Sequence, residues 1–311
     1  MGIAPRGRPP TGLSVPEEWK LSASGGPRPF VTWARYDLPD SSGYLWESRR
    51  QRKGRGPERA GAAAKRGPWS SWWAPDRLAW WIAIGFMLGS ALFIAGAWGS
   101  LVPHVFGGEH QMSLFAESCY CTGAVLYTVS IYGQILESLN SDDRIGPDRT
   151  SHPPERFRWI GFEPRRIEFM TPAVVFVGSV VFNYETVVAL GATLDLLPRL
   201  WLWETSMVGS FLFLASSCMQ IAEAGHGYVR FKPRDISWWV GVCFVLGSIG
   251  FVVGTVPGLD PPGLPTAAQG GGAAIVKIGF LVGGIFFLIG SYLMVPEMFT
   301  QLRNQGRPGK M

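Results

Sequence analysis

Long apolar runs recur along this 311-residue chain. Three of them, 78–108, 118–136 and 236–259, contain no Asp, Glu, Lys or Arg. About 20 apolar residues of helix cross a hydrocarbon core of about 30 Å, and a helix satisfies its backbone polar groups within one segment. The pattern predicts an all-α integral membrane protein with six transmembrane helices, near residues 77–101, 114–137, 169–193, 201–223, 235–257 and 275–297.

The first, third and fifth predicted helices share a Gly-Ser pattern, FMLGSALF, FVGSVVF and FVLGSIGF, anchored on Gly89, Gly178 and Gly247. A Phe follows each glycine by four residues, and a proline precedes it by fourteen. The second, fourth and sixth helices repeat a different pattern, in which a Gly is followed by an aromatic residue and then by Glu. These residues are Gly123, Tyr127 and Glu137; Gly209, Phe213 and Glu223; and Gly283, Phe287 and Glu297.

This period predicts three tandem copies of one two-helix hairpin, each beginning and ending on the same side of the membrane. Their common orientation favours a pseudo-threefold arrangement about the membrane normal. The hairpins are assigned to residues 73–137, 162–223 and 231–297. The linkers then occupy 138–161 and 224–230, and the tail 298–311.

The repeated pattern resembles the YrhK-like domain, a small bacterial membrane module of two helices with Gly-Ser-aromatic packing and a Glu that closes the second helix. The resemblance covers residues 73–297 as three copies, through Pro75, Pro164 and Pro233 with the motifs above. The second copy departs from it, because it lacks a Trp pair at its start. The resemblance implies a membrane module without an established activity, and it transfers no catalytic or ligand residues.

Positive charge alternates between the predicted connections. Thirteen Lys and Arg precede residue 77, and more follow in 138–168, 225–235 and the tail, whereas the other connections contain Arg199 alone. By the positive-inside rule, both termini are predicted to lie in the cytoplasm of a multi-pass cell-membrane protein. The net charge of +5 therefore reflects topology and predicts no nucleic-acid partner.

Residues 1–72 are basic and rich in Pro, Gly and Arg, a composition that predicts a mostly disordered cytoplasmic segment. A short hairpin is possible at 31–49, where two aromatic-bearing runs flank turn residues. A basic cluster follows, formed by Arg49, Arg50, Arg52, Lys53 and Arg55. It is either a solvated linker or a surface for anionic lipid headgroups or a protein partner.

Four polar residues lie toward the outer ends of the predicted helices, namely Asn183, Glu185, Lys277 and Glu117. Glu185 is seven residues, about 10 Å, outside the Gly-Ser level of its helix. Ionisable groups inside a membrane are costly, so they are candidates for a transport site. The alternative is a structural ion pair near the headgroups, such as one between Glu185 and Lys277.

Glu137, Glu223 and Glu297 form an inner acidic set at the cytoplasmic ends of their helices. If they point toward the bundle axis, they form an acidic ring that could select cations at a pore mouth. If they point sideways, they pair with basic residues at the helix starts, which are Arg77, Arg165, Arg166 and Arg234.

No catalytic motif is found in the sequence, and no catalytic residue, cofactor or metal is expected. His104, His110 and Glu109 share one predicted loop, which is weak evidence for a metal, and His226 lies in a connection without an evident partner. The sequence therefore predicts a non-enzymatic membrane module of unknown biochemical role. The alternatives are a small-solute or ion permease with a site near Glu185, and an assembly or sensory protein that acts through its basic N-terminal segment.

Overall fold

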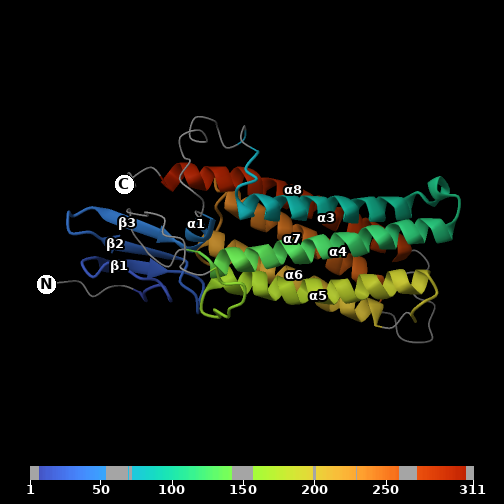
Figure 1. The fold of residues 1–311 in the computed structure, drawn as a ribbon, viewed down its shortest axis with the longest axis horizontal. Coiled ribbons are helices and arrows are strands. Elements are labelled where there is room, and N and C mark those ends of the chain that lie inside the picture. Colours follow the sequence, from blue (N-terminus) through green and yellow to red (C-terminus); the bar gives the residue numbers. More distant parts are fainter. Residues whose placement is uncertain are drawn as a thin grey trace.

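The structure is a computed structural model that describes residues 7–53, 69, 72–141, 157–198, 201–228, 230–258 and 272–305. A small β-sheet lies at one end of a bundle of long helices (Figure 1). We call this end of the bundle the sheet end and the opposite end the far end. Within the described ranges, six helices are long and apolar enough to cross a membrane. They are α3 (Leu78–Leu101), α4 (Glu109–Leu139), α5 (Ile167–Thr193), α6 (Leu202–Gly225), α7 (Ile236–Thr255) and α8 (Gly272–Gln305).

The six helices form a closed ring. Each packs against its neighbours in the chain, and α8 also packs against α3. Two 3-10 helices, η1 (Pro103–Phe106) and η2 (Val256–Gly258), lie at the far end. The six spans predicted from hydropathy are confirmed, with helix ends that differ by a few residues except in α8, which extends further at its C-terminal end.

Glycines bring the helices of each hairpin into close contact. A Cβ atom added to Gly89 of α3 would lie 3.1 Å from the carbonyl oxygen of Gly123 in α4, and the reverse distance is also 3.1 Å. Tyr127 covers Gly89, and Phe93 covers Gly123. The same reciprocal contact joins α5 to α6 through Gly178 and Gly209, and α7 to α8 through Gly247 and Gly283. Small residues allow such close approach in membrane bundles.

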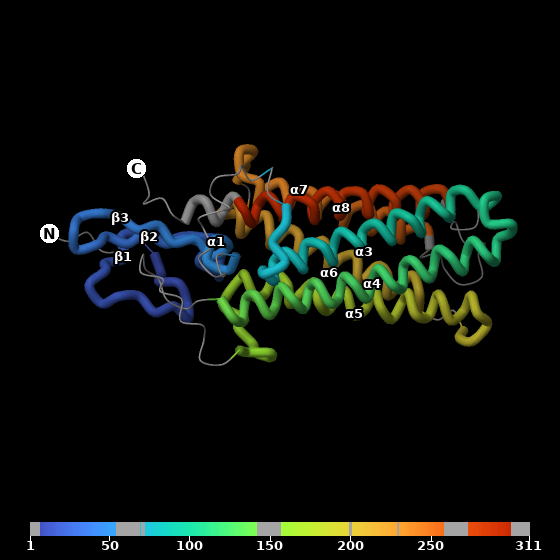
Figure 2. The backbone as a smooth tube through the Cα atoms, turned by 45° about the horizontal axis from the view of Figure 1, so that its top comes forward, coloured from blue at the N-terminus to red at the C-terminus, as the bar shows by residue number. Residues whose placement is uncertain are grey.

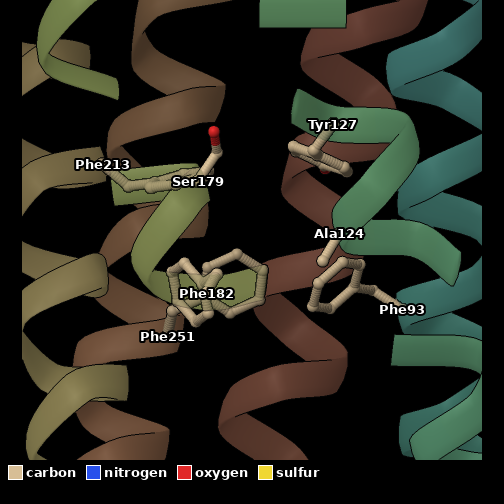
Figure 3. Close-up of a pocket in the computed structure, with 7 residues that line it drawn as sticks. All are labelled: Phe93, Ala124, Tyr127, Ser179, Phe182, Phe213 and Phe251. Atoms are coloured by element: carbon tan, nitrogen blue, oxygen red, sulfur yellow. The ribbon is translucent and has the colours of Figure 1, made fainter. Parts of the chain in front are cut away.

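Six buried aromatic side chains, one from each helix, meet in the middle of the bundle. They are Phe93, Tyr127, Phe182, Phe213, Phe251 and Phe287. Their rings are in contact, as in the stacked pair Phe251–Phe287 with centroids 5.2 Å apart. The cavity left beside them has a volume of about 10 Å³ and is also lined by Ala124 and Ser179 (Figure 3). A cavity of this size holds about one water molecule, so aromatic rings close the bundle at this level.

The sheet contains β1 (Lys20–Gly25), β2 (Trp33–Asp37) and β3 (Gly43–Glu47), paired antiparallel in the order β1-β2-β3. The buried residues Ala34, Tyr36 and Trp46 form its small core. The hairpin predicted at 31–49 is present as β2 and β3. The expectation of disorder is wrong for residues 20–53, which form the sheet and a short helix, α1 (Ser48–Lys53). A two-stranded hairpin alone is marginal in water, but β1 and the docking of α1 supply further burial.

The close approach of α7 and α8 predicts that Gly279 cannot be replaced by a residue with a side chain without loss of stability. A Cβ atom at Gly279 of α8 would lie 2.6 Å from the Cα atom of Gly254 in α7, so Gly279→Leu has to separate two backbones. We expect a loss of about 1–3 kcal/mol or more in the free energy of unfolding, since overpacking has costs of this size. Thermal unfolding in detergent measures the change. Ala91→Leu, on the exposed side of α3, is the matched control and should leave the melting temperature nearly unchanged.

Candidate functional site at the sheet end

The helix α1 inserts basic side chains into the sheet end of the bundle. It follows β3 without an intervening residue, and it contacts α4, α5, α6 and α8 (Figure 2). Arg49, Arg52 and Lys53 are all buried. Their spacing of three and four residues places them on one face of a helical turn. The basic cluster is therefore not a solvated linker or a lipid-facing surface at these three positions, and Arg55 lies outside the described residues.

Three carboxylates receive these cations, one each from α4, α6 and α8. Glu297 makes the closest contacts, because its Oε1 accepts from the Nε atom of Arg49 at 2.6 Å and its Oε2 accepts from the Nζ atom of Lys53. Glu223 lies 3.6 Å from Arg49 and 3.8 Å from Arg52, and Glu137 lies 3.8 Å from Arg52. Three positive charges thus meet three negative charges. We call these six residues the plug cluster.

Within the plug cluster, Glu297 has shorter contacts with the cations of α1 than Glu223 and Glu137 have. Glu223 is fully buried, and its Oε1 accepts from Ser48 at 3.0 Å. Its Oε2 has ion pairs but no hydrogen bond with any residue that the structure describes. The amide of Gln220, with its oxygen assigned toward Arg49, accepts from that guanidinium at 3.3 Å. Glu297 therefore carries most of the short contacts, while Glu223 and Glu137 act mainly through charge.

Burial and the nearby carboxylates shift the pKa values of the cations of α1 in opposite directions. Burial alone would lower the pKa of Arg49, but the carboxylates of Glu297 and Glu223 outweigh it and raise that pKa above its usual value. For Lys53, burial is the largest influence and lowers the pKa, with Glu297 opposing it. An ammonium in such a place depends on its carboxylate to remain charged.

The basic residues expected to pair with the glutamates have other surroundings. Arg166 binds Glu168 at 2.9 Å, Glu163 at 2.7 Å and Ser141 at 2.6 Å. Arg165 and Arg234 are exposed. The three glutamates form ion pairs with α1 and not with these helix-start arginines, because α1 fills the space between the helix ends.

The connection after α6 holds the sheet from a second side. His226 lies 3.1 Å from Thr32 through Nδ1 and 3.1 Å from Glu47 through Nε2, and Tyr228 donates to the carbonyl oxygen of Arg28. The expectation that His226 lacks a partner is therefore wrong. Burial tends to raise the pKa of Glu47, but the hydrogen bond from His226 and the charges of Arg50, His226 and Lys232 together lower it below its usual value.

The chain of contacts from Thr32 through His226 to Glu47 has the connectivity of a hydrolase triad. A nucleophile in such a triad must reach a substrate carbonyl. The Thr32 side chain is fully buried, and its hydroxyl also lies 3.5 Å from the carbonyl oxygen of Gly25. The geometry therefore supports a structural contact between the sheet and α6.

The outer polar residues are not brought together as expected. Glu185 of α5 and Lys277 of α8 form no ion pair, because α8 packs against α3 and α7 while α5 packs against α4 and α6. Glu185 instead lies within electrostatic range of Glu117 in α4. Asn183 donates to Thr128 of α4 and to the carbonyl oxygen of Ser179. Among the described residues, no group of three His, Cys, Asp or Glu could hold a metal ion.

Comparison of the chain with protein-family models, with curated protein sequences and with solved structures finds no match.

The short contacts of Glu297 predict that even a conservative substitution at this residue strongly lowers the stability of the protein. In Glu297→Gln the shape of the side chain is kept, but Arg49 and Lys53 lose their closest carboxylate. Removing one partner of a buried pair costs about 3–5 kcal/mol, and we expect a destabilisation of this order. Thermal unfolding of the purified protein measures it. Arg50→Gln breaks a partly exposed pair with Glu47 and should cost about 1 kcal/mol or less.

The contact between His226 and Glu47 predicts a dependence on pH. The pKa of Glu47 in the folded protein is lower than its usual value of 4.5. Its stabilising contribution is therefore complete above that pH and is lost as the pH falls through the lower, folded-state pKa. The difference in melting temperature between the wild type and Glu47→Gln, measured from pH 7 down to pH 3, should shrink toward zero at the acid end. A difference that stays constant would contradict this role of Glu47.

Proposed function

We propose that this protein is a non-enzymatic, multi-pass membrane protein whose bundle holds its N-terminal sheet in a fixed orientation as an interaction module. The role belongs to the assembly or sensory class. One observation carries the proposal, namely that Arg49, Arg52 and Lys53 are buried among glutamates from three different helices. A flexible linker would not need this burial, since a free basic segment is better solvated in water.

The surface of the sheet supports an interaction role. Leu45 in β3 is 48% exposed, and Arg35 in β2 points away from the buried core of the sheet. The contacts of His226 and Tyr228 restrain the sheet from the side of α6. A sheet held at several points presents its outer surface in one orientation, which lowers the entropy lost when a partner binds.

We also propose that the three hairpins are copies of one unit around a pseudo-threefold axis, with both termini in the cytoplasm. The reciprocal glycine contacts and the aromatic residues that cover them support this arrangement, because each hairpin has the same pair. The distribution of Lys and Arg supports the orientation. We further propose that each hairpin is related to the YrhK-like domain, on the basis of the repeated motifs that carry the resemblance in the sequence.

A permease with a site near Glu185 is the weaker proposal. Glu185 and Glu117 lie within electrostatic range of each other on neighbouring helices, and Asn183 precedes Glu185 by two residues. The aromatic rings at the centre of the bundle leave a cavity of about 10 Å³, which is small for a solute path. The inner acidic residues are occupied by α1, so they do not line an open mouth in this conformation.

Site-specific photo-crosslinking tests the interaction role. The full-length protein, with a photoreactive amino acid in place of Leu45, is expressed in its native host. On illumination it should form an adduct with another protein. The variant R49Q/R52Q/K53Q should lose this adduct, because the sheet is no longer held against the bundle. The same probe at Leu88, exposed on the apolar surface of α3, is the control and should form no protein adduct. Absence of an adduct at Leu45, together with a solute flux in proteoliposomes that Glu185→Gln abolishes, would favour the permease.

A further inference from the structure

Three of the helices begin with the same backbone turn but with different side chains. The residues before α3, α5 and α7 are Arg77, Arg166 and Asp235, all in extended conformation. Each amide donates to the carbonyl oxygen three residues earlier, at 3.0, 3.1 and 3.0 Å. Because the backbone is the same, the three positions can be compared residue by residue.

At two of the three positions the side chain is satisfied within the protein. Asp235 accepts from the backbone amide of Ser237 at 2.9 Å. Arg166 donates to Glu163, three residues before it, and to Glu168, two residues after it, and also to Ser141. Both patterns satisfy a polar side chain at a helix start from within the chain.

Arg77 lacks these partners. The positions that correspond to Glu163 and Glu168 are occupied by Ala74 and Ala79. The Arg77 residue is partly exposed, so its guanidinium can be approached from outside the bundle, while its buried Nη1 atom has no hydrogen-bond partner among the described residues. Burial lowers the pKa of Arg77, opposed by the charge of the exposed Asp76, yet a guanidinium keeps its proton at any physiological pH. A cation is therefore held at this place without the acceptors that its counterpart in α5 has.

The surroundings of Arg77 are typical of the headgroup level of a membrane. Trp72, Trp73 and Trp81 are exposed, and together with Trp80 they form a chain of edge-to-face contacts with centroids 4.9 to 5.4 Å apart. The indole of Trp81 donates to the carbonyl oxygen of Pro75 at 2.9 Å. Tryptophans gather at the membrane–water interface, where phospholipid phosphates also lie. The guanidinium of arginine matches a phosphate in both charge and geometry.

We propose that Arg77 binds the phosphodiester group of a phospholipid in the leaflet at the sheet end, with the neighbouring tryptophans packing against the lipid. The lipid phosphate supplies the acceptor oxygens that Glu163 and Glu168 supply to Arg166. The inference rests on the bundle lying in a membrane, and it is independent of the role proposed for the sheet.

Native mass spectrometry of the full-length protein, in detergent micelles that contain palmitoyl-oleoyl phosphatidylglycerol, tests the site. In Arg77→Gln the affinity for the first bound lipid should fall about tenfold or more, as expected for loss of a charge-assisted contact. Arg165→Gln removes an exposed arginine next to Arg166 and should bind lipid like the wild type. Retention of the lipid by Arg77→Gln at wild-type affinity would overturn the proposal.

A second variant separates the site from a general effect on folding. Ala79→Glu places a carboxylate where α5 has Glu168, so it should pair with Arg77 and weaken lipid binding to a similar extent. The melting temperatures of both variants check that the fold is kept. Displacement of the lipid by inorganic phosphate alone would indicate a site for free phosphate and would overturn the assignment to a lipid. Unchanged lipid binding in a folded Ala79→Glu would do so as well.

Discussion

The pairing of buried charges at the sheet end is the constraint on which the rest of the structure depends. Glu223 and Glu297 are almost completely buried, and an ionised carboxylate in such a place costs several kcal/mol unless a cation lies beside it. The cations come from Arg49, Arg52 and Lys53, which are equally costly to bury alone. Neither the bundle end nor α1 can therefore adopt this arrangement without the other. Folding of the N-terminal segment is therefore coupled to folding of the helices, because each neutralises the buried charges of the other.

This coupling also explains why the sheet is ordered. A sheet of three short strands has a core of only a few residues, here Ala34, Tyr36 and Trp46. Its last strand continues directly into α1, so docking of α1 fixes one end of the sheet. His226 and Tyr228 then restrain it from α6 and the residues after it. The sheet therefore depends on burial against the bundle, because its own core is too small to keep it folded.

The bundle is closed at two levels along its length. In the middle, aromatic rings from all six helices fill the axis and leave space for about one water molecule. At the sheet end, the plug cluster fills the space between α4, α6 and α8. An acidic ring that is neutralised from within the chain does not attract ions from solution, because its charge is already balanced.

Long apolar runs by themselves determined the six helices, since a membrane leaves a long uncharged segment few alternatives to a helix. The internal repeat identified Glu137, Glu223 and Glu297 as a set, because their spacing from a glycine recurs. The basic residues of α1 were visible in SRRQRK, but composition classed the segment around them as disordered. The partners of Arg49, Arg52 and Lys53 lie 85 to 248 residues away in the chain, with the 248 of Arg49 and Glu297 the longest separation. Only the tertiary structure decided those pairs, because local sequence carries no information on which distant charges a folded chain brings together.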